Sequence, residues 1–224
     1  MDLKKVFSHV DHTLLKPTAT WEQIQKICEE GLRFGMASVC IPPCFVKRAK
    51  EKYPELNVCT VIGFPLGYNP REVKVQEARQ ALSEGAGEID MVVNLGDVKA
   101  GDFEKVTGEI RALKKEAGDR ILKVIIETCY LTEEEKIALC RCVTEGGADF
   151  IKTSTGFGTG GATMDDILLL KKHIGPGVRV KASGGIRTAK DILAYLEAGV
   201  DRIGASGAIT AFKDEAGANE GGNY

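Results

Sequence analysis

Two lysines stand near the ends of short apolar runs that lead directly into glycines. Lys152 follows the apolar pair at 150–151 and precedes residues 156–161, a stretch with four glycines. A lysine at the end of a buried parallel strand loses hydration, which disfavours its charged form and can leave a nucleophilic amine near neutral pH. An isolated lysine in such a place is more commonly a solvated strand end. Reactive-amine chemistry therefore needs support from a second feature.

Lys181 supplies that feature. It lies near the end of the predicted strand 178–182, and Gly184 and Gly185 follow that strand. Two lysines on neighbouring parallel strands would face each other at one mouth of the fold, and each positive charge would favour loss of a proton from the other. The repeated arrangement favours chemistry by a pair of lysines over two independent strand ends.

The elements that must hold these lysines follow a repeated βα pattern. Four times a predicted helix ends at a glycine and the chain turns into an apolar strand, after Gly31, Gly85, Gly146 and Gly199. The strand candidates are residues 10–11, 37–41, 58–62, 88–93, 121–127, 148–153, 178–182 and 202–205. Eight strands in a chain of 224 residues predict an α/β fold, a single (β/α)8 or TIM barrel over residues 1–213. We also expect a short N-terminal helix and a flexible C-terminal tail over residues 214–224.

An open doubly wound sheet is the alternative fold. It would normally carry a glycine fingerprint after its first strand, whereas the first strand here leads into residues 11–17, which contain no glycine. The glycines instead follow the sixth, seventh and eighth strands. Barrels commonly build phosphate sites from the loops after their last two strands, so the position of the glycines favours the barrel.

Alternation along the strands places a carboxylate with the lysines. In the fourth strand Asp90 shares one face with Val92 and Asn94, and the opposite face is apolar, so we expect Asp90 to point into the barrel. The same parity groups Lys123 with Glu127, Phe150 with Lys152, and Arg179 with Lys181. An inward carboxylate beside two or three lysines can keep one protonated while another is neutral, which provides an acid and a base. A buried ion-pair network that only fills the barrel is the alternative.

The last two loops have the composition of a phosphate site. Gly184 and Gly185 follow the seventh strand, and residues 204–207, which include Gly204 and Ser206, follow the eighth. Backbone N–H groups, a hydroxyl and a helix amino terminus there could bind a phosphate dianion. The alternative is that these glycines are ordinary turn residues, but their order along the chain favours a phosphorylated ligand.

Composition favours a cytoplasmic enzyme or binding protein with a small-molecule partner. The net charge of −2, with 28% charged residues, gives no basic field for nucleic acid. No apolar run approaches the roughly 18 residues that cross a membrane, and the amino terminus does not resemble a signal peptide. The seven cysteines form no Cys-x-x-Cys pair and are expected to be reduced. His9 and His12 have no evident third ligand, so we expect no metal.

With these residues in place, the sequence resembles the deoxyribose-phosphate aldolases of the metal-independent, Schiff-base class. The resemblance extends over nearly the whole chain. It rests on residues 11–16, 38–43, 63–67, 88–94, 123–128, 150–156, 181–187 and 204–206. It implies reversible cleavage of 2-deoxyribose 5-phosphate to acetaldehyde and glyceraldehyde 3-phosphate, with no cofactor, in a homodimer.

The resemblance also implies residue roles. Lys152 would form the imine with the substrate aldehyde, Lys181 would keep Lys152 deprotonated, and Asp90 would relay protons with Lys181 and a water. The remaining implied contacts are Asp11 and Cys40 in the pocket and Thr155, Gly156, Gly184, Gly185, Gly204 and Ser206 around the substrate and its phosphate. Tyr224, the last residue, would reach the active site and assist proton transfer, as a terminal tyrosine does in some members; a disordered terminus is the alternative.

One position departs from the family pattern. Some members carry a lysine after the Thr-Gly pair of the sixth loop, and this chain has Phe157 there. We therefore expect that loop to contribute less to phosphate affinity than it does in those members.

Two other functions fit the same residues. A sugar-phosphate isomerase would use Asp11 and Asp90 as acid and base without covalent chemistry. A non-catalytic binder of phosphorylated ligands would use the lysines only as counter-charges. A borohydride-stable adduct on Lys152 in the presence of substrate would distinguish the aldolase from both.

Overall fold

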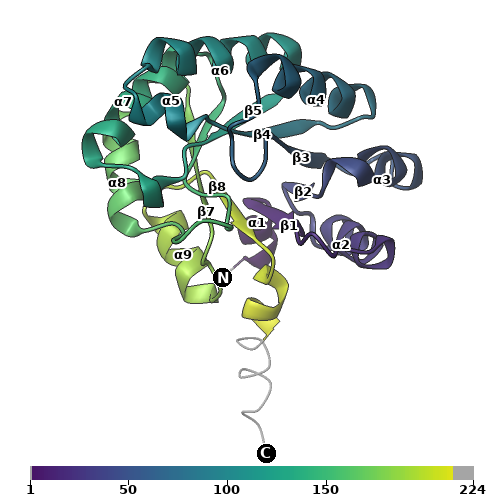
Figure 1. The fold of residues 1–224 in the computed structure, drawn as a ribbon. Coiled ribbons are helices and arrows are strands. Elements are labelled where there is room, and N and C mark those ends of the chain that lie inside the picture. Colours follow the sequence, from purple (N-terminus) through teal and green to yellow (C-terminus); the bar gives the residue numbers. More distant parts are fainter. Residues whose placement is uncertain (1, 214–224) are drawn as a thin grey trace, which may run out of the picture.

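The computed structural model describes residues 2–213 and shows a closed barrel of eight parallel strands in the order β1 to β8. The strands are β1 (Val10–Thr13), β2 (Ser38–Cys40), β3 (Val58–Ile62), β4 (Glu88–Val92), β5 (Ile121–Ile125), β6 (Phe150–Lys152), β7 (Arg179–Ser183) and β8 (Arg202–Ala205). Figure 1 shows the helices surrounding these strands. The predicted α/β barrel is confirmed, and the doubly wound sheet is excluded because β1 pairs with β8.

The helices alternate with the strands along the chain. They are α1 (Leu3–Phe7), α2 (Trp21–Phe34), α3 (Val46–Lys52), α4 (Arg71–Ser83), α5 (Leu95–Lys99), α6 (Phe103–Ala117), α7 (Glu133–Glu145), α8 (Met164–His173) and α9 (Ala189–Glu197), with 3-10 turns η1 (Pro43–Phe45) and η2 (Thr128–Tyr130). The predicted short N-terminal helix is α1. In the described part of the chain no helix is both long and apolar enough to span a membrane.

Local sequence explains where the helices begin. At α7 the backbone N–H of Thr132 donates to the Glu135 carboxylate at 2.8 Å, and the backbone N–H of Glu135 donates to the Thr132 hydroxyl at 3.3 Å. This reciprocal capping satisfies two N–H groups that a helix start would otherwise leave unpaired. The same capping box starts α9 at Thr188. These capping boxes fix the residues at which α7 and α9 begin.

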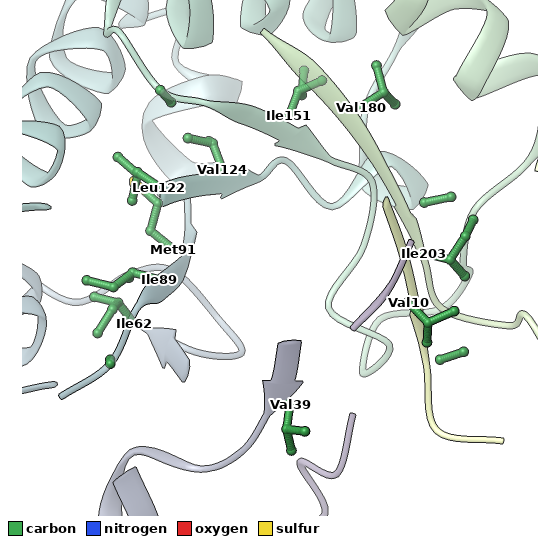
Figure 2. Close-up of a cluster of buried hydrophobic side chains, with 14 of the residues drawn as sticks. Val10, Val39, Ile62, Ile89, Met91, Leu122, Val124, Ile151, Val180 and Ile203 are labelled. Carbon is green, nitrogen blue, oxygen red and sulfur yellow. The ribbon is translucent and has the colours of Figure 1, made fainter. Parts of the chain in front are cut away.

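Alternation along the strands separates an apolar outer layer from a charged interior. Figure 2 shows apolar side chains, among them Ile89 and Met91 of β4 and Val124 of β5, projecting from the strands into the main hydrophobic cluster. Neighbouring residues on the same strands, such as Asp90 and Lys123, belong to the opposite face and carry charge although they are fully buried. The expected inward position of Asp90 is confirmed.

The fifth strand is shorter than expected. The ladder ends at Ile125 and not at Glu127, because Glu127 adopts a left-handed backbone conformation with φ 53°. This conformation turns the chain out of the strand and into η2. The loop that begins there lies beside the end of β6, where Lys152 is located.

Candidate active site

One carboxylate binds the three lysines of the barrel interior. Asp90 Oδ2 accepts hydrogen bonds from Lys152 Nζ and Lys181 Nζ, both at 2.7 Å. Asp90 Oδ1 accepts a hydrogen bond from Lys123 Nζ at 2.8 Å. Strand register explains the arrangement, since Asp90 is opposite Lys123 across β4 and β5, and Lys152 is opposite Lys181 across β6 and β7. The two lysines that the sequence paired therefore meet on one oxygen atom.

A second layer of ion pairs lies next to this one. Asp11 Oδ2 lies 2.6 Å from Lys181 Nζ, and its other oxygen pairs with Arg202. Glu88 joins Arg202 to Lys123. All of these side chains are at least nine-tenths buried. The result is a continuous network that extends from β1 and β8 across to β4 and β5.

Opposing effects of burial and charge set the protonation states in the network. Burial alone would raise the pKa of Asp90, but the charges of the lysines outweigh it and hold that pKa well below the usual range. Burial alone would lower the pKa of Lys181, but Asp11 and Asp90 outweigh it and raise that pKa. The pKa of Lys123 is raised in the same way, against its burial, by Asp90 and its other anionic neighbours. Asp90 is therefore ionised, and Lys181 and Lys123 are cations.

The network holds one more basic group than it has carboxylates. Its basic side chains are Lys123, Lys152, Lys181 and Arg202, and its carboxylates are Asp11, Glu88 and Asp90. Uncompensated charge is costly in a dry interior. The electrically neutral state is the one in which a single lysine has lost its proton.

Lys152 has the fewest carboxylate partners of the basic groups in the network. It pairs with one carboxylate, Asp90, whereas Lys181 pairs with two and Lys123 with three. Arg202 does not deprotonate in proteins. Lys152 is also the one member of the network that lines an open cavity.

The cavity beside Lys152 has a volume of about 410 Å³. Its lining includes Lys152 and six of the residues that the sequence nominated for substrate or phosphate, Thr155, Gly156, Gly184, Gly185, Gly204 and Ser206. These residues come from the loops after β6, β7 and β8, so the predicted convergence of three glycine-containing loops is present. The cavity lies at the carboxyl ends of the strands, where barrels carry their chemistry.

Two nominated pocket residues lie behind this lining. Asp11 is fully buried and engaged by Lys181 and Arg202. Cys40 is fully buried in a small apolar cluster with Cys59 and Val61, against which Leu15 packs. Leu15 lines the cavity and Cys40 does not. Tyr224 lies outside the described residues.

Sequence reasoning missed several members of the site. Lys16 and Arg187 line the cavity and bring cationic side chains to its glycine-rich end. Both belong to the stretches that carry the family resemblance, residues 11–16 and 181–187, but neither was assigned a role. Glu88 could have been found by parity, because it shares a strand face with Asp90. The same reasoning applied to the eighth strand would have turned Arg202 inward together with Gly204.

One group of possible metal ligands occurs within residues 2–213, formed by Cys40, Cys59 and Asp90. The Asp90 oxygens already accept hydrogen bonds from three lysines, and Lys123 Nζ lies 3.4 Å from Cys59 Sγ. Positive charge on this scale opposes a bound cation. The group therefore does not suit a metal.

Comparisons with known proteins agree on one family. A family model described as DeoC/LacD family aldolase matches residues 5–214. The chain is 58% identical over 216 residues to a protein of Clostridium botulinum (strain Alaska E43 / Type E3) named deoxyribose-phosphate aldolase, with 96% of this chain and 98% of the relative covered.

Two solved structures extend the comparison to the fold. One, described as "QR15, an Aldolase", superposes with a TM-score of 0.91 at 38% identity and covers 97% of this chain and 99% of its own. The other is a deoxyribose phosphate aldolase from Aeropyrum pernix, described as a unique tetramer. It gives a TM-score of 0.85 at 33% identity, with 95% of this chain and 92% of the other covered.

Proposed function

The chain belongs to the DeoC/LacD family of aldolases, and from that premise we propose that Lys152 is its Schiff-base lysine. The enzyme acts on deoxyribose phosphate, as the full-length similarity to deoxyribose-phosphate aldolases supports. It cleaves 2-deoxyribose 5-phosphate reversibly into acetaldehyde and glyceraldehyde 3-phosphate. The proposal concerns how this barrel carries out that reaction.

The covalent steps follow from a neutral amine at position 152. Lys152 Nζ attacks C1 of the open-chain aldehyde, and loss of water leaves a protonated imine. The C3 hydroxyl gives up its proton, the C2–C3 bond breaks, and its electron pair moves toward the imine nitrogen, which releases glyceraldehyde 3-phosphate. The remaining enamine takes a proton at C2, and hydrolysis of the imine releases acetaldehyde and regenerates the amine. Asp90 and Lys181, with a water, move the protons.

The observation that carries this proposal is the surplus of one basic group in the buried network. Because Lys123, Lys181 and Arg202 each pair with at least two carboxylates, they retain their charge. Lys152 can therefore lose its proton without leaving a buried carboxylate unpaired. A nucleophile next to a cation and a carboxylate has both an acid and a base within reach.

The direct test combines product formation with trapping. Deoxyribose 5-phosphate should release acetaldehyde, and borohydride added during turnover should leave a reduced adduct that peptide mapping places on Lys152. Turnover to an isomeric sugar phosphate with no trapped adduct would support the isomerase. Binding with neither acetaldehyde nor adduct would support the non-catalytic binder. Either result would reject the aldolase mechanism.

The phosphate end of the cavity yields a further prediction. The Phe157 position supplies no charge, whereas Lys16 and Arg187 line the cavity, and we propose that they bind the phosphate with Gly184, Gly185 and Ser206. Lys16→Met should raise KM for deoxyribose 5-phosphate by about three- to tenfold, a modest effect because Lys16 is exposed to screening.

Steady-state kinetics at fixed ionic strength measure the effect of that variant. Lys26→Met is the matched control, because Lys26 lines the neighbouring groove with Lys16 but not the catalytic cavity. Equal KM values for Lys16→Met and the wild-type enzyme would remove Lys16 from phosphate binding.

Two parts of the proposal, the role of Tyr224 and the homodimer, rest on family resemblance, and the cytoplasmic location rests on the sequence. Tyr224, outside the described residues, would assist proton transfer at the acetaldehyde carbon. The enzyme would work in the cytoplasm and as a homodimer. The Aeropyrum pernix relative is described as tetrameric, so the mass of this protein in solution is the measurement that decides its assembly.

A further inference from the structure

Glu127 has an unusual backbone conformation close to the reactive lysine. Among residues 2–213 it is the one residue other than glycine with a positive φ, at φ 53° and ψ 66°. A residue with a side chain is strained in this left-handed region. Such strain persists where the surrounding structure over-determines it, and it concentrates at functional sites.

Backbone hydrogen bonds continue past the end of β5 on either side of Glu127, and they show that Glu127 is an extra residue relative to the segment it pairs with. The backbone N–H of Ile126 donates to the carbonyl of Lys152 at 3.0 Å, and that of Thr128 donates to the carbonyl of Thr153 at 2.9 Å. Between these two hydrogen bonds the donor segment advances by two residues, whereas the acceptor segment after β6 advances by one. This is the arrangement of a β-bulge, which redirects the side chain of the extra residue.

The redirected carboxylate binds the loop that follows β6. It accepts a hydrogen bond from the backbone N–H of Thr155 at 3.1 Å and another from the Thr155 hydroxyl. The Thr155 oxygen in turn accepts a hydrogen bond from the backbone N–H of Phe157 at 3.0 Å. Thr155 and Gly156 both line the catalytic cavity. Glu127 therefore holds residues 155–157 in place, of which Thr155 and Gly156 belong to the cavity wall.

The loop also folds closely over this carboxylate. A Cβ atom at Gly158 would lie 3.1 Å from the Glu127 carboxyl carbon and 3.0 Å from Cys129 Sγ. Glu127 is 3% exposed, and within the described residues it forms no ion pair with a lysine, arginine or histidine. Its contacts thus serve this loop and not the charged network that surrounds Asp90.

We propose that Glu127 is a positioning residue that fixes the substrate-binding wall of the cavity through Thr155. This inference rests on the proposed function, since the wall is assigned to the phosphorylated substrate there. Lys152 is oriented separately, by Asp90. Loss of the Glu127 carboxylate should therefore weaken binding of the phosphorylated substrate more than it slows chemistry at the amine.

One variant can separate substrate binding from the reactivity of the Lys152 amine. Glu127→Ala should raise KM for deoxyribose 5-phosphate about tenfold, because a small displacement of binding groups is costly, and should lower kcat less than about threefold. Acetaldehyde has no phosphate and alkylates the amine when cyanoborohydride is present. The rate at which it labels Lys152 should stay within about twofold of wild type, since Asp90 still holds the lysine.

Further variants separate the side chain from the backbone. Glu127→Gly relieves the strained φ but lacks the carboxylate, so it should show the same KM increase with higher thermal stability than Glu127→Ala. Glu127→Gln retains one acceptor and should be intermediate. Thr155→Val should raise KM similarly, and the double variant Glu127→Ala/Thr155→Val should be no worse than the weaker-binding single variant.

Asp149→Ala is the control for a merely structural role. Asp149 precedes β6, and its carboxylate accepts the backbone N–H of Leu122 at 2.9 Å, away from the cavity lining. Its loss should lower Tm and leave KM unchanged. An unchanged KM in Glu127→Ala and Glu127→Gln would overturn the inference. So would a labelling rate that falls by the same factor as KM rises. Absence of acetaldehyde release and of Lys152 labelling in the wild-type enzyme would instead reject the proposed function.

Discussion

Replacing Lys152 with arginine is expected to lower kcat/KM for deoxyribose 5-phosphate by at least about 10⁴-fold, because covalent catalysis loses its nucleophile. A guanidinium group stays protonated in proteins and cannot form the imine. Arginine places a fixed positive charge beside Asp90, so this variant holds one uncompensated charge in the buried network. Turnover and borohydride trapping should therefore be lost, and Tm should fall modestly because of the extra buried charge, with the protein still folded at the assay temperature.

A matched control is available on the surface. Lys172 lies in the last turn of α8 and is exposed, so Lys172→Arg should have the activity of the wild-type enzyme. Residual cleavage by Lys152→Arg within about 100-fold of wild type would mean that covalent catalysis at this position is not required. A borohydride adduct mapped to Lys181 in the wild-type enzyme would assign the imine to the other lysine.

The sequence predicted the barrel and its charged interior through simple periodicities. Glycine-terminated helices followed by apolar strands located four of the strands, although α2 continues past Gly31 to Phe34. Further apolar runs between them located the other four. Alternation within β4 turned Asp90 inward, and the structure places Lys123, Lys152 and Lys181 around it. These features were accessible because strand parity depends on neighbouring residues alone.

Features that depend on the closure of the barrel were not accessible. Parity alone would turn Glu88 and Arg202 inward, but their pairing with each other and with Asp11 joins strands far apart in the sequence and depends on closure of the barrel. The bulge at Glu127 was missed because Ile125 and Ile126, which precede it, are apolar and continue the strand pattern. Cys40 lies in an apolar cluster behind the cavity lining, because Leu15 packs against that cluster and lines the cavity in its place.

Removing the charge of Lys181 should make Lys152 hold its proton to higher pH. In the wild-type network the surplus basic group allows one lysine to be neutral. In Lys181→Met the remaining basic groups, Lys123, Lys152 and Arg202, equal the carboxylates in number, and neutrality then requires a protonated Lys152. The acid limb of the kcat/KM profile should move up by about one to two pH units, and the rate at pH 7 should fall about 10- to 100-fold.

Asp11→Asn provides a control with the opposite sign. It removes a carboxylate from the network, which increases the surplus of positive charge, so the acid limb should move to lower pH. Generic damage to the barrel would lower activity at all pH values in both variants, whereas opposite displacements require a balance of charges. If both profiles keep the wild-type midpoint, the charge of Lys181 does not govern the protonation of Lys152. Its role would then be limited to the proton relay with Asp90, and the neutral amine would need another explanation.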